Sequence, residues 1–78
     1  MENFSINSAK SYIGKNVNLH LKDGAVIINV QLKGIRKDSG KNSLIEYAPD
    51  RKHRTTRIPL RNVAWAELLN SNFLRRAA

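Results

Sequence analysis

Residues 12–24 read Tyr12-Ile13-Gly14-Lys15-Asn16-Val17-Asn18-Leu19-His20-Leu21-Lys22-Asp23-Gly24 and carry the clearest structural signal in this chain. Apolar and polar side chains alternate from Val17 to Lys22, which is the pattern of a strand with one buried face. The Asp23-Gly24 pair favours a tight hairpin turn, because it tolerates the positive φ that such a turn requires. A second apolar run starts directly afterwards, so the sequence predicts a local antiparallel hairpin.

The residues around this hairpin predict one helix and three more strands. Residues 5–13 fit a short helix that Ser5 or Asn7 caps and that Gly14 ends. The expected strands, in chain order, span residues 16–22, about 25–35, 43–48, about 55–60 and 63–69. We therefore expect a mainly β fold, a small five-stranded antiparallel barrel with a short N-terminal helix.

The second strand is long enough to bend. On its inward face we expect Val26, Ile28, Val30 and Leu32. Gly34 stands where this apolar pattern changes phase, which indicates a bulge or corner that curls the sheet over itself.

The later strands carry further signals. The strand at 43–48 is apolar on both faces, so it should be covered on both sides, and Glu46 within it needs solvent or a cationic partner. Pro59 predicts an edge or a strand end, because proline has no N–H to donate to a neighbouring strand. Residues 63–69 fit a helix or a strand, and the alternation of Val63 and Trp65 with alanines favours the strand.

Length and composition bound the class of protein. The 78 residues predict one domain over 1–78, with 70–78 as a tail for which fraying and docking both stay open. A domain of this size buries a modest core, so subunit contacts are an expected source of stability. The sequence has no cysteine, which excludes disulfides and thiol chemistry. No apolar run is long enough for a bilayer, and a cytoplasmic or nucleoid-associated protein is expected.

The charge balance points to a polyanionic partner. Lys and Arg number 14 against 6 acidic residues, a formal net charge of +8. Between positions 33 and 61 the basic residues are Lys33, Arg36, Lys37, Lys41, Arg51, Lys52, Arg54, Arg57 and Arg61. Such a concentration is typical of a nucleic-acid-binding protein, and a solvated basic face that serves another purpose is the alternative.

An enzymatic function has little support in the sequence. His20 lies on the outward face of its strand, and His53 lies among cations that disfavour its protonation. We expect neither histidine to have a second histidine or a carboxylate at metal-ligand spacing. The glycines stand at turns and at a bulge and form no phosphate-binding loop. We therefore expect a protein that is not an enzyme and that holds no metal or cofactor.

The run from Ile13 to Gly24 resembles the first half of the first Sm motif, and the chain is similar to the Sm-like (Lsm/Hfq-type) family of small barrels. Leu60-Arg61-Asn62-Val63 stands where the second Sm motif has a basic residue and a small residue before the last strand. The order of elements matches over about residues 6–69. The resemblance implies an SH3-like or Sm-like barrel, single-stranded RNA as the ligand, and a ring. In that ring the edge strand near residues 43–48 would pair with the last strand of a neighbouring copy.

Three positions differ from the family pattern. Asn29 stands where the second strand of the family has glycine, and Asn62 replaces the glycine of the second motif. The loop whose residues hold a flipped-out base in the family is matched by Asp38-Ser39-Gly40-Lys41-Asn42, in which Lys41 replaces the stacking side chain.

The candidate binding residues lie in the two loops that follow the second and third strands, in the strand at about 55–60 and in the turn before the last strand. We expect nucleic-acid contacts from Lys41, Asn42, Arg51, Lys52, Arg54, Arg57, Arg61 and Asn62, with Tyr47 as a stacking residue. The favoured function is RNA binding by a homo-oligomer, and RNA is favoured over DNA through the resemblance. Two alternatives stay open: a monomeric or dimeric SH3-like barrel that binds duplex DNA, and an interaction module whose basic face meets an acidic protein.

Overall fold

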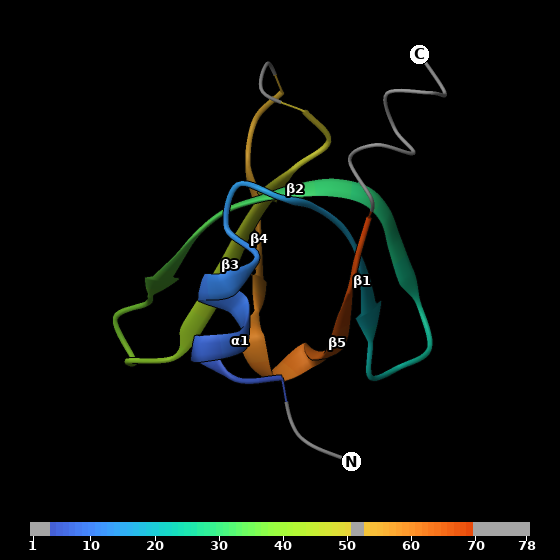
Figure 1. The fold of residues 1–78 in the computed structure, drawn as a ribbon. Coiled ribbons are helices and arrows are strands. Elements are labelled where there is room, and N and C mark those ends of the chain that lie inside the picture. The colour runs from blue at the N-terminus through green and yellow to red at the C-terminus, as the bar shows by residue number, and fades with distance from the viewer. Residues whose placement is uncertain (1–3, 51–52, 70–78) are drawn as a thin grey trace.

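The computed structural model describes residues 4–50 and 53–69, which form a mainly β fold with a short N-terminal helix (Figure 1). The elements are α1 (Ile6–Ser11), β1 (Asn16–Leu21), β2 (Val26–Lys37), β3 (Ser43–Ala48), β4 (Thr56–Pro59), the 3-10 turn η1 (Leu60–Asn62) and β5 (Val63–Leu68). Each predicted element is therefore confirmed with small shifts at its ends, including the strand predicted for residues 63–69. The tail at 70–78 and the basic pair at 51–52 lie outside the described residues.

The five strands form one antiparallel sheet in the order β4-β3-β2-β1-β5. The expected closed barrel is wrong, because β4 and β5 are the two edges of the sheet and are not paired with each other. β4 has four residues and ends at Pro59, which leads directly into η1, so no ladder to β5 can form there. Figure 1 shows the strongly bent sheet and η1 connecting its two edges.

Residues 43–48, which we expected to form an edge strand that joins neighbouring copies, form β3 in the middle of the sheet. β3 lies inside the sheet, between β2 and β4, with partners on both sides. Its own residues explain this position, because Ile45 and Ala48 are completely buried on opposite faces. The prediction that residues 43–48 form an edge is therefore wrong, and the prediction that the strand is covered on both faces is confirmed.

The inward side chains of the bent sheet form one core, made of Val17, Leu19, Val30, Leu32, Ile45, Val63 and Ala66. The pattern expected for β2 is wrong in its first half, where Ile28 is 73% exposed and Ile27 packs against the core instead. The pairing register explains the change, because Leu19 pairs with Ile27 while Val17 pairs with Val30. The extra residue is accommodated at Asn29, whose φ is +51°. A second register shift lies at Gly34, as predicted.

The N-terminal helix begins at the predicted cap, since the Ser5 hydroxyl accepts a hydrogen bond from the Ser8 backbone N–H at 3.1 Å. After the helix, Gly14 takes a φ of +85° and donates its backbone N–H to the Leu32 carbonyl at 2.8 Å. The chain is thereby attached to β2 immediately before β1 begins. Ala9 is completely buried, and Figure 1 shows α1 lying in front of the bent sheet.

Candidate nucleic-acid interface

A shallow pocket of about 350 Å³ brings together residues that are distant in the sequence. Its lining comes from the chain before α1, the end of β1, the loop between β2 and β3 and the turn η1. It consists of Phe4, Lys22, Lys41, Asn42, Ser43, Leu60 and Arg61. Its volume lies in the range of small-molecule sites, about 300–1,000 Å³. The pocket therefore unites three of the predicted binding residues, Lys41, Asn42 and Arg61.

The loop at 38–42 is held in shape by Asp38. One carboxylate oxygen of Asp38 accepts hydrogen bonds from the backbone N–H groups of Gly40 and Asn42, each at 2.9 Å. The Asp38 backbone N–H also donates to the Asn42 carbonyl at 2.9 Å, which closes the loop. The Asn42 backbone hydrogen bond is the main cause of the lowered pKa of Asp38, and the charge of Arg61 also lowers it. Asp38 therefore remains ionised and fixes the loop beside η1.

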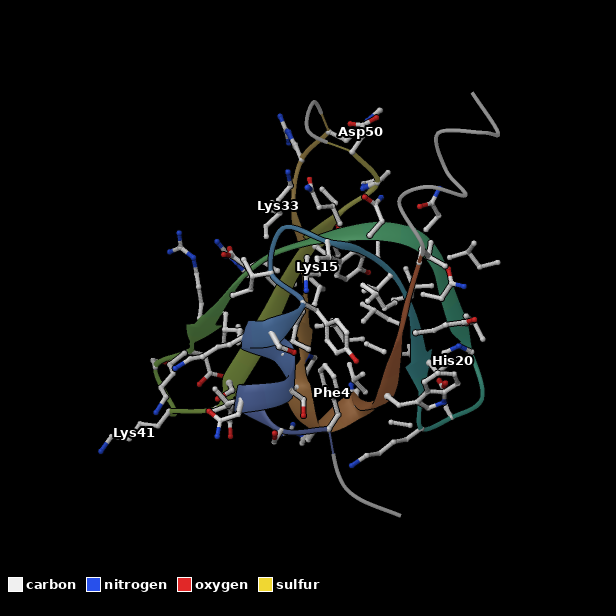
Figure 2. The ribbon with its side chains drawn as sticks, in the orientation of Figure 1. Phe4, Lys15, His20, Lys33, Lys41 and Asp50 are labelled. Carbon is white, nitrogen blue, oxygen red and sulfur yellow. The ribbon has the colours of Figure 1, made fainter. Side chains whose placement is uncertain are left out.

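Lys41 occupies the position where the resemblance places a stacking side chain, and its backbone has a φ of +66°. Figure 2 shows its side chain extending away from the body of the molecule. The ammonium group is therefore available to a ligand that approaches the pocket from solvent.

Asn62 lies beside this pocket rather than in it, because it lines a second hollow of about 240 Å³ with Leu21, Lys22 and Asp23. Lys22 lines both hollows, and its backbone N–H donates to the Asn62 carbonyl at 2.9 Å.

The described part of the loop between β3 and β4 lies far from the pocket. Figure 2 shows Asp50, in the loop between β3 and β4, far from Lys41. Arg54 follows this loop and is exposed, whereas Arg51 and Lys52 lie outside the described residues. His53 in the same loop has a carboxylate partner that we did not expect, since its Nδ1 lies 2.8 Å from Asp50 Oδ1. Among the described residues, this loop and the cations of the pocket are therefore in separate parts of the molecule.

Arg57 is bound to a carboxylate of its own sheet. Its Nε donates to Glu46 Oε2 at 2.9 Å, and Arg36 Nε lies 3.0 Å from the same oxygen. These two hydrogen bonds, that of Arg57 first, lower the pKa of Glu46. The expected cationic partner of Glu46 is thus confirmed and proves to be two arginines.

Tyr47 lies apart from the pocket, with Leu32 and Thr56 as its cross-strand neighbours. Its half-buried ring packs against the core of the sheet. An aromatic side chain packed in this way contributes mainly to stability, so the structure gives the predicted stacking role of Tyr47 no support.

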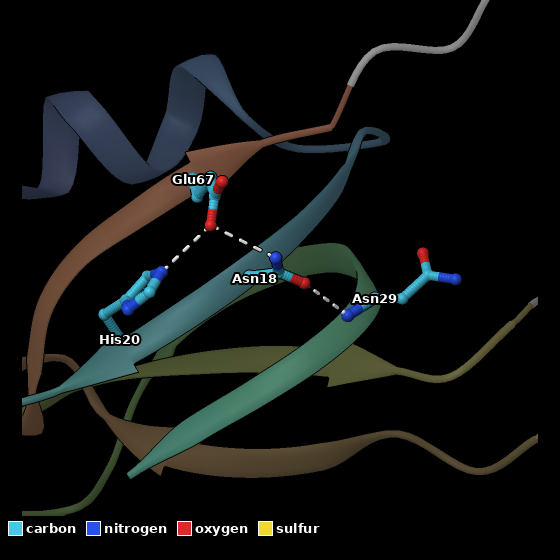
Figure 3. Close-up of polar contacts among 4 residues, drawn as sticks. All are labelled: Asn18, His20, Asn29 and Glu67. Atoms are coloured by element: carbon cyan, nitrogen blue, oxygen red, sulfur yellow. Dashed lines mark hydrogen bonds and ion pairs between the residues drawn. The ribbon is translucent and has the colours of Figure 1, made fainter. Parts of the chain in front are cut away.

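A further aromatic feature lies on the outward face of β1 and β5. The rings of His20 and Trp65 are stacked with centroids 3.9 Å apart, and Trp65 is 47% exposed. Trp65 is therefore not a core residue. Glu67 Oε1 lies 3.1 Å from His20 Nε2 and also accepts a hydrogen bond from Asn18 Nδ2 (Figure 3). These contacts, with His20 as the larger contribution, lower the pKa of Glu67.

Sequence reasoning missed Lys22 and Arg36 as candidate functional residues. Lys22 directly precedes the Asp-Gly turn, so the sequence predicted its place at the end of β1. Its proximity to Arg61 depends on the tertiary structure and could not be predicted. Arg36 was counted among the basic residues without a partner, because the pairing of β2 with β3 decides which side chain faces it.

The described residues contain neither a metal-binding cluster nor a membrane-spanning helix. No group of three or more histidine, aspartate or glutamate side chains within residues 4–50 and 53–69 is arranged to hold a metal ion. The same residues contain no helix with the length and apolarity to span a membrane.

Comparisons with protein-family models, curated proteins and solved structures find no match to this chain.

Proposed function

We propose that this protein is a non-catalytic RNA-binding protein of the Sm-like type, which binds single-stranded RNA at the pocket between residues 38–43 and η1. The observation that carries the proposal is the meeting of these two segments, which are the ones that resemble the nucleotide-binding parts of the Sm motifs. Lys22 adds a cation from the end of β1. A nucleotide at this place would meet cations and an amide together.

The resemblance gains support from the first position at which the chain leaves the family pattern. Asn29 stands where the family has glycine, and its φ of +51° lies in the left-handed region that glycine favours. Asparagine is the residue that tolerates this region best after glycine. Its backbone N–H donates to the Asn18 side chain at 2.7 Å, which helps to hold the bend. The substitution therefore preserves the backbone that a bent second strand needs.

The chemistry of the pocket suits an unpaired nucleotide. An arginine such as Arg61 can stack on a base, and an amide such as that of Asn42 can bond to its edge, which requires bases that are not already paired. Lys22 and Lys41 would contact phosphate groups, which provide affinity without reading the sequence. Phe4 is the one aromatic residue of the pocket lining among the residues that the structure describes.

Assembly into a ring is part of this proposal. β4 and β5 are the edges of the sheet, and each has a row of backbone groups facing away from it. Pairing β4 of one copy with β5 of the next would satisfy both rows, and about five to seven copies would close the ring. Trp65, exposed on β5, would lie near such a junction.

Binding measurements can test the function directly. We expect a fluorescently labelled oligo-uridine to bind more tightly than duplex DNA at both low and physiological salt, and Arg61→Ala and Lys22→Ala to weaken this binding. Lys10→Ala removes the same charge from α1 and serves as the control. Preference for duplex DNA would favour the alternative of a DNA-binding barrel, and native mass measurement of a monomer would overturn the ring.

A protein-interaction module is the second candidate. The exposed side chains of Trp65 and Ile28 favour it, because large apolar groups on an outward face often mark contacts with another protein. In that case Arg61→Ala and Lys22→Ala would leave retention on immobilised RNA unchanged.

A further inference from the structure

Three charged residues form a row across neighbouring strands on the outward face of the sheet. Arg36 comes from β2, Glu46 from β3 and Arg57 from β4. Glu46 points away from the core, since Ile45 and Tyr47 on either side of it pack inward. Both guanidinium Nε atoms reach the same oxygen of Glu46, at 3.0 Å for Arg36 and 2.9 Å for Arg57. We call this row the arginine pair, with Glu46 as its bridge.

The burial of the three side chains places the arginines outermost. The Glu46 side chain is 12% exposed, whereas those of Arg36 and Arg57 are 65% and 53% exposed. The carboxylate thus lies beneath two guanidinium groups that face solvent. Within residues 4–50 and 53–69, the structure gives the remaining guanidinium N–H groups no hydrogen-bond partner.

This arrangement is suited to a phosphate group. A guanidinium group is planar and carries five N–H donors. Arg57 gives its Nε donor to Glu46, and Arg36 forms an ion pair with the same carboxylate oxygen through its Nε. The bridge orients both groups before any ligand arrives and leaves the row with one net positive charge. An anion above the pair would meet donors that are already held in place, so less conformational entropy is lost on binding.

The arginine pair lies close to the pocket along the same two strands. Arg36 is the cross-strand partner of Leu44, and Lys37 is the partner of Ser43, which lines the pocket. The loop that connects these strand ends is the loop at 38–42. One turn of chain therefore separates the pocket from the first arginine of the pair.

We propose that Arg36 and Arg57 form a second phosphate-binding site for the RNA strand whose nucleotide occupies the pocket. The strand would leave the pocket across the loop at 38–42 and continue over the outward face of β2, β3 and β4. This inference rests on the proposed function and adds the path of the bound strand. It also gives Glu46 a positioning role, because it fixes the two guanidinium groups.

The dependence of RNA affinity on salt tests the inference. For single strands, each phosphate contact contributes about 0.7 to the slope of log affinity against log salt. Because the arginine pair with its bridge carries one net positive charge and holds one phosphate, Arg36→Ala, Arg57→Ala and the double variant should each lower the slope by about 0.7. Arg36→Lys and Arg57→Lys keep the charge and should keep the slope, and Lys10→Ala should change neither slope nor affinity.

A second measurement uses the unaltered protein, so it does not depend on the folding of any variant. The Nε–H group of Arg57 is hydrogen-bonded to Glu46, and that of Arg36 is held beside the same carboxylate oxygen by an ion pair. Both groups should give resolved nitrogen-15 NMR signals that shift when oligo-uridine is added.

The possible outcomes separate the inference from the proposed function. The second site would be overturned if the Arg36→Ala and Arg57→Ala variants kept the salt slope of the unaltered protein and the Nε–H signals did not shift. If Arg61→Ala still weakened binding in that case, the proposed function would stand. An unaltered protein with no affinity for oligo-uridine would overturn both.

Discussion

Replacing Asn29 with alanine tests the bend in β2, on which the position of the whole first hairpin depends. Asn29 has a φ of +51°, and its side-chain oxygen accepts a hydrogen bond from Asn16 Nδ2 at 3.2 Å. The left-handed conformation costs an ordinary L-residue about 1–2 kcal/mol, and asparagine less, because its short polar side chain bonds locally. Alanine at this position therefore keeps the backbone strain and loses the side-chain hydrogen bond that offsets it.

Asn16→Ala is the matched control, because it removes the same side-chain hydrogen bond from a residue that is not among those with positive φ. The difference between Asn29→Ala and Asn16→Ala then isolates the backbone term, which we expect to be about 1 kcal/mol. For a small protein that loses about 1 kcal/mol of stability per molar urea, this equals a fall of about 1 M in the unfolding midpoint. Asn29→Gly should stay within about 0.5 kcal/mol of the unaltered protein, because glycine adopts this φ without strain.

Urea unfolding followed by circular dichroism measures all three variants under the same conditions. Equal midpoints for Asn29→Ala and Asn16→Ala would refute the reasoning, since the backbone at position 29 would then carry no strain. A change in the slope of the transition would indicate that the denatured state had changed, and stability would then have to be compared by thermal unfolding.

Three further predictions concern stability. Because the pKa of Glu46 is lowered in the folded protein, its ionised form stabilises the fold above the ordinary value of 4.5, and this contribution is lost as the pH falls through the lowered pKa; acid unfolding of Glu46→Gln should show a weaker dependence on pH in this range. Lys41→Gly should raise the free energy of unfolding by about 0.5 kcal/mol relative to Lys41→Ala, because alanine retains the strain of the φ of +66°; equal urea midpoints would contradict this. Ile45→Ala should cost about 2–5 kcal/mol, as is usual for a completely buried side chain, and Trp65→Ala clearly less, because nearly half of Trp65 is exposed; the reverse order in thermal unfolding would show that Trp65 is covered in solution.

Local signals in the sequence were sufficient to predict the helix and the five strands. The alternation from Val17 to Leu21, the Asp23-Gly24 turn and the Ser5 cap act over a few residues, so their outcome depends little on the rest of the chain. The apolar character of both faces of β3 likewise predicted its coverage before its neighbours were known. The resemblance to the Sm motifs also drew on such short patterns.

The tertiary structure decided what depends on strand register and on long-range pairing. A bulge at Asn29 turned Ile28 outward, because one inserted residue exchanges the faces of a strand. The pairing of three strands placed Arg36 and Arg57 on the same carboxylate, and the bend of the sheet brought Lys22 to the pocket that Arg61 also lines. Whether β4 and β5 close the sheet likewise depended on the whole path of the chain. Composition and local sequence patterns therefore determined that this protein is a basic β protein, because charge is a sum over residues and strands follow from short-range alternation. The distribution of its cations between a pocket, a sheet face and a distant loop followed from the fold.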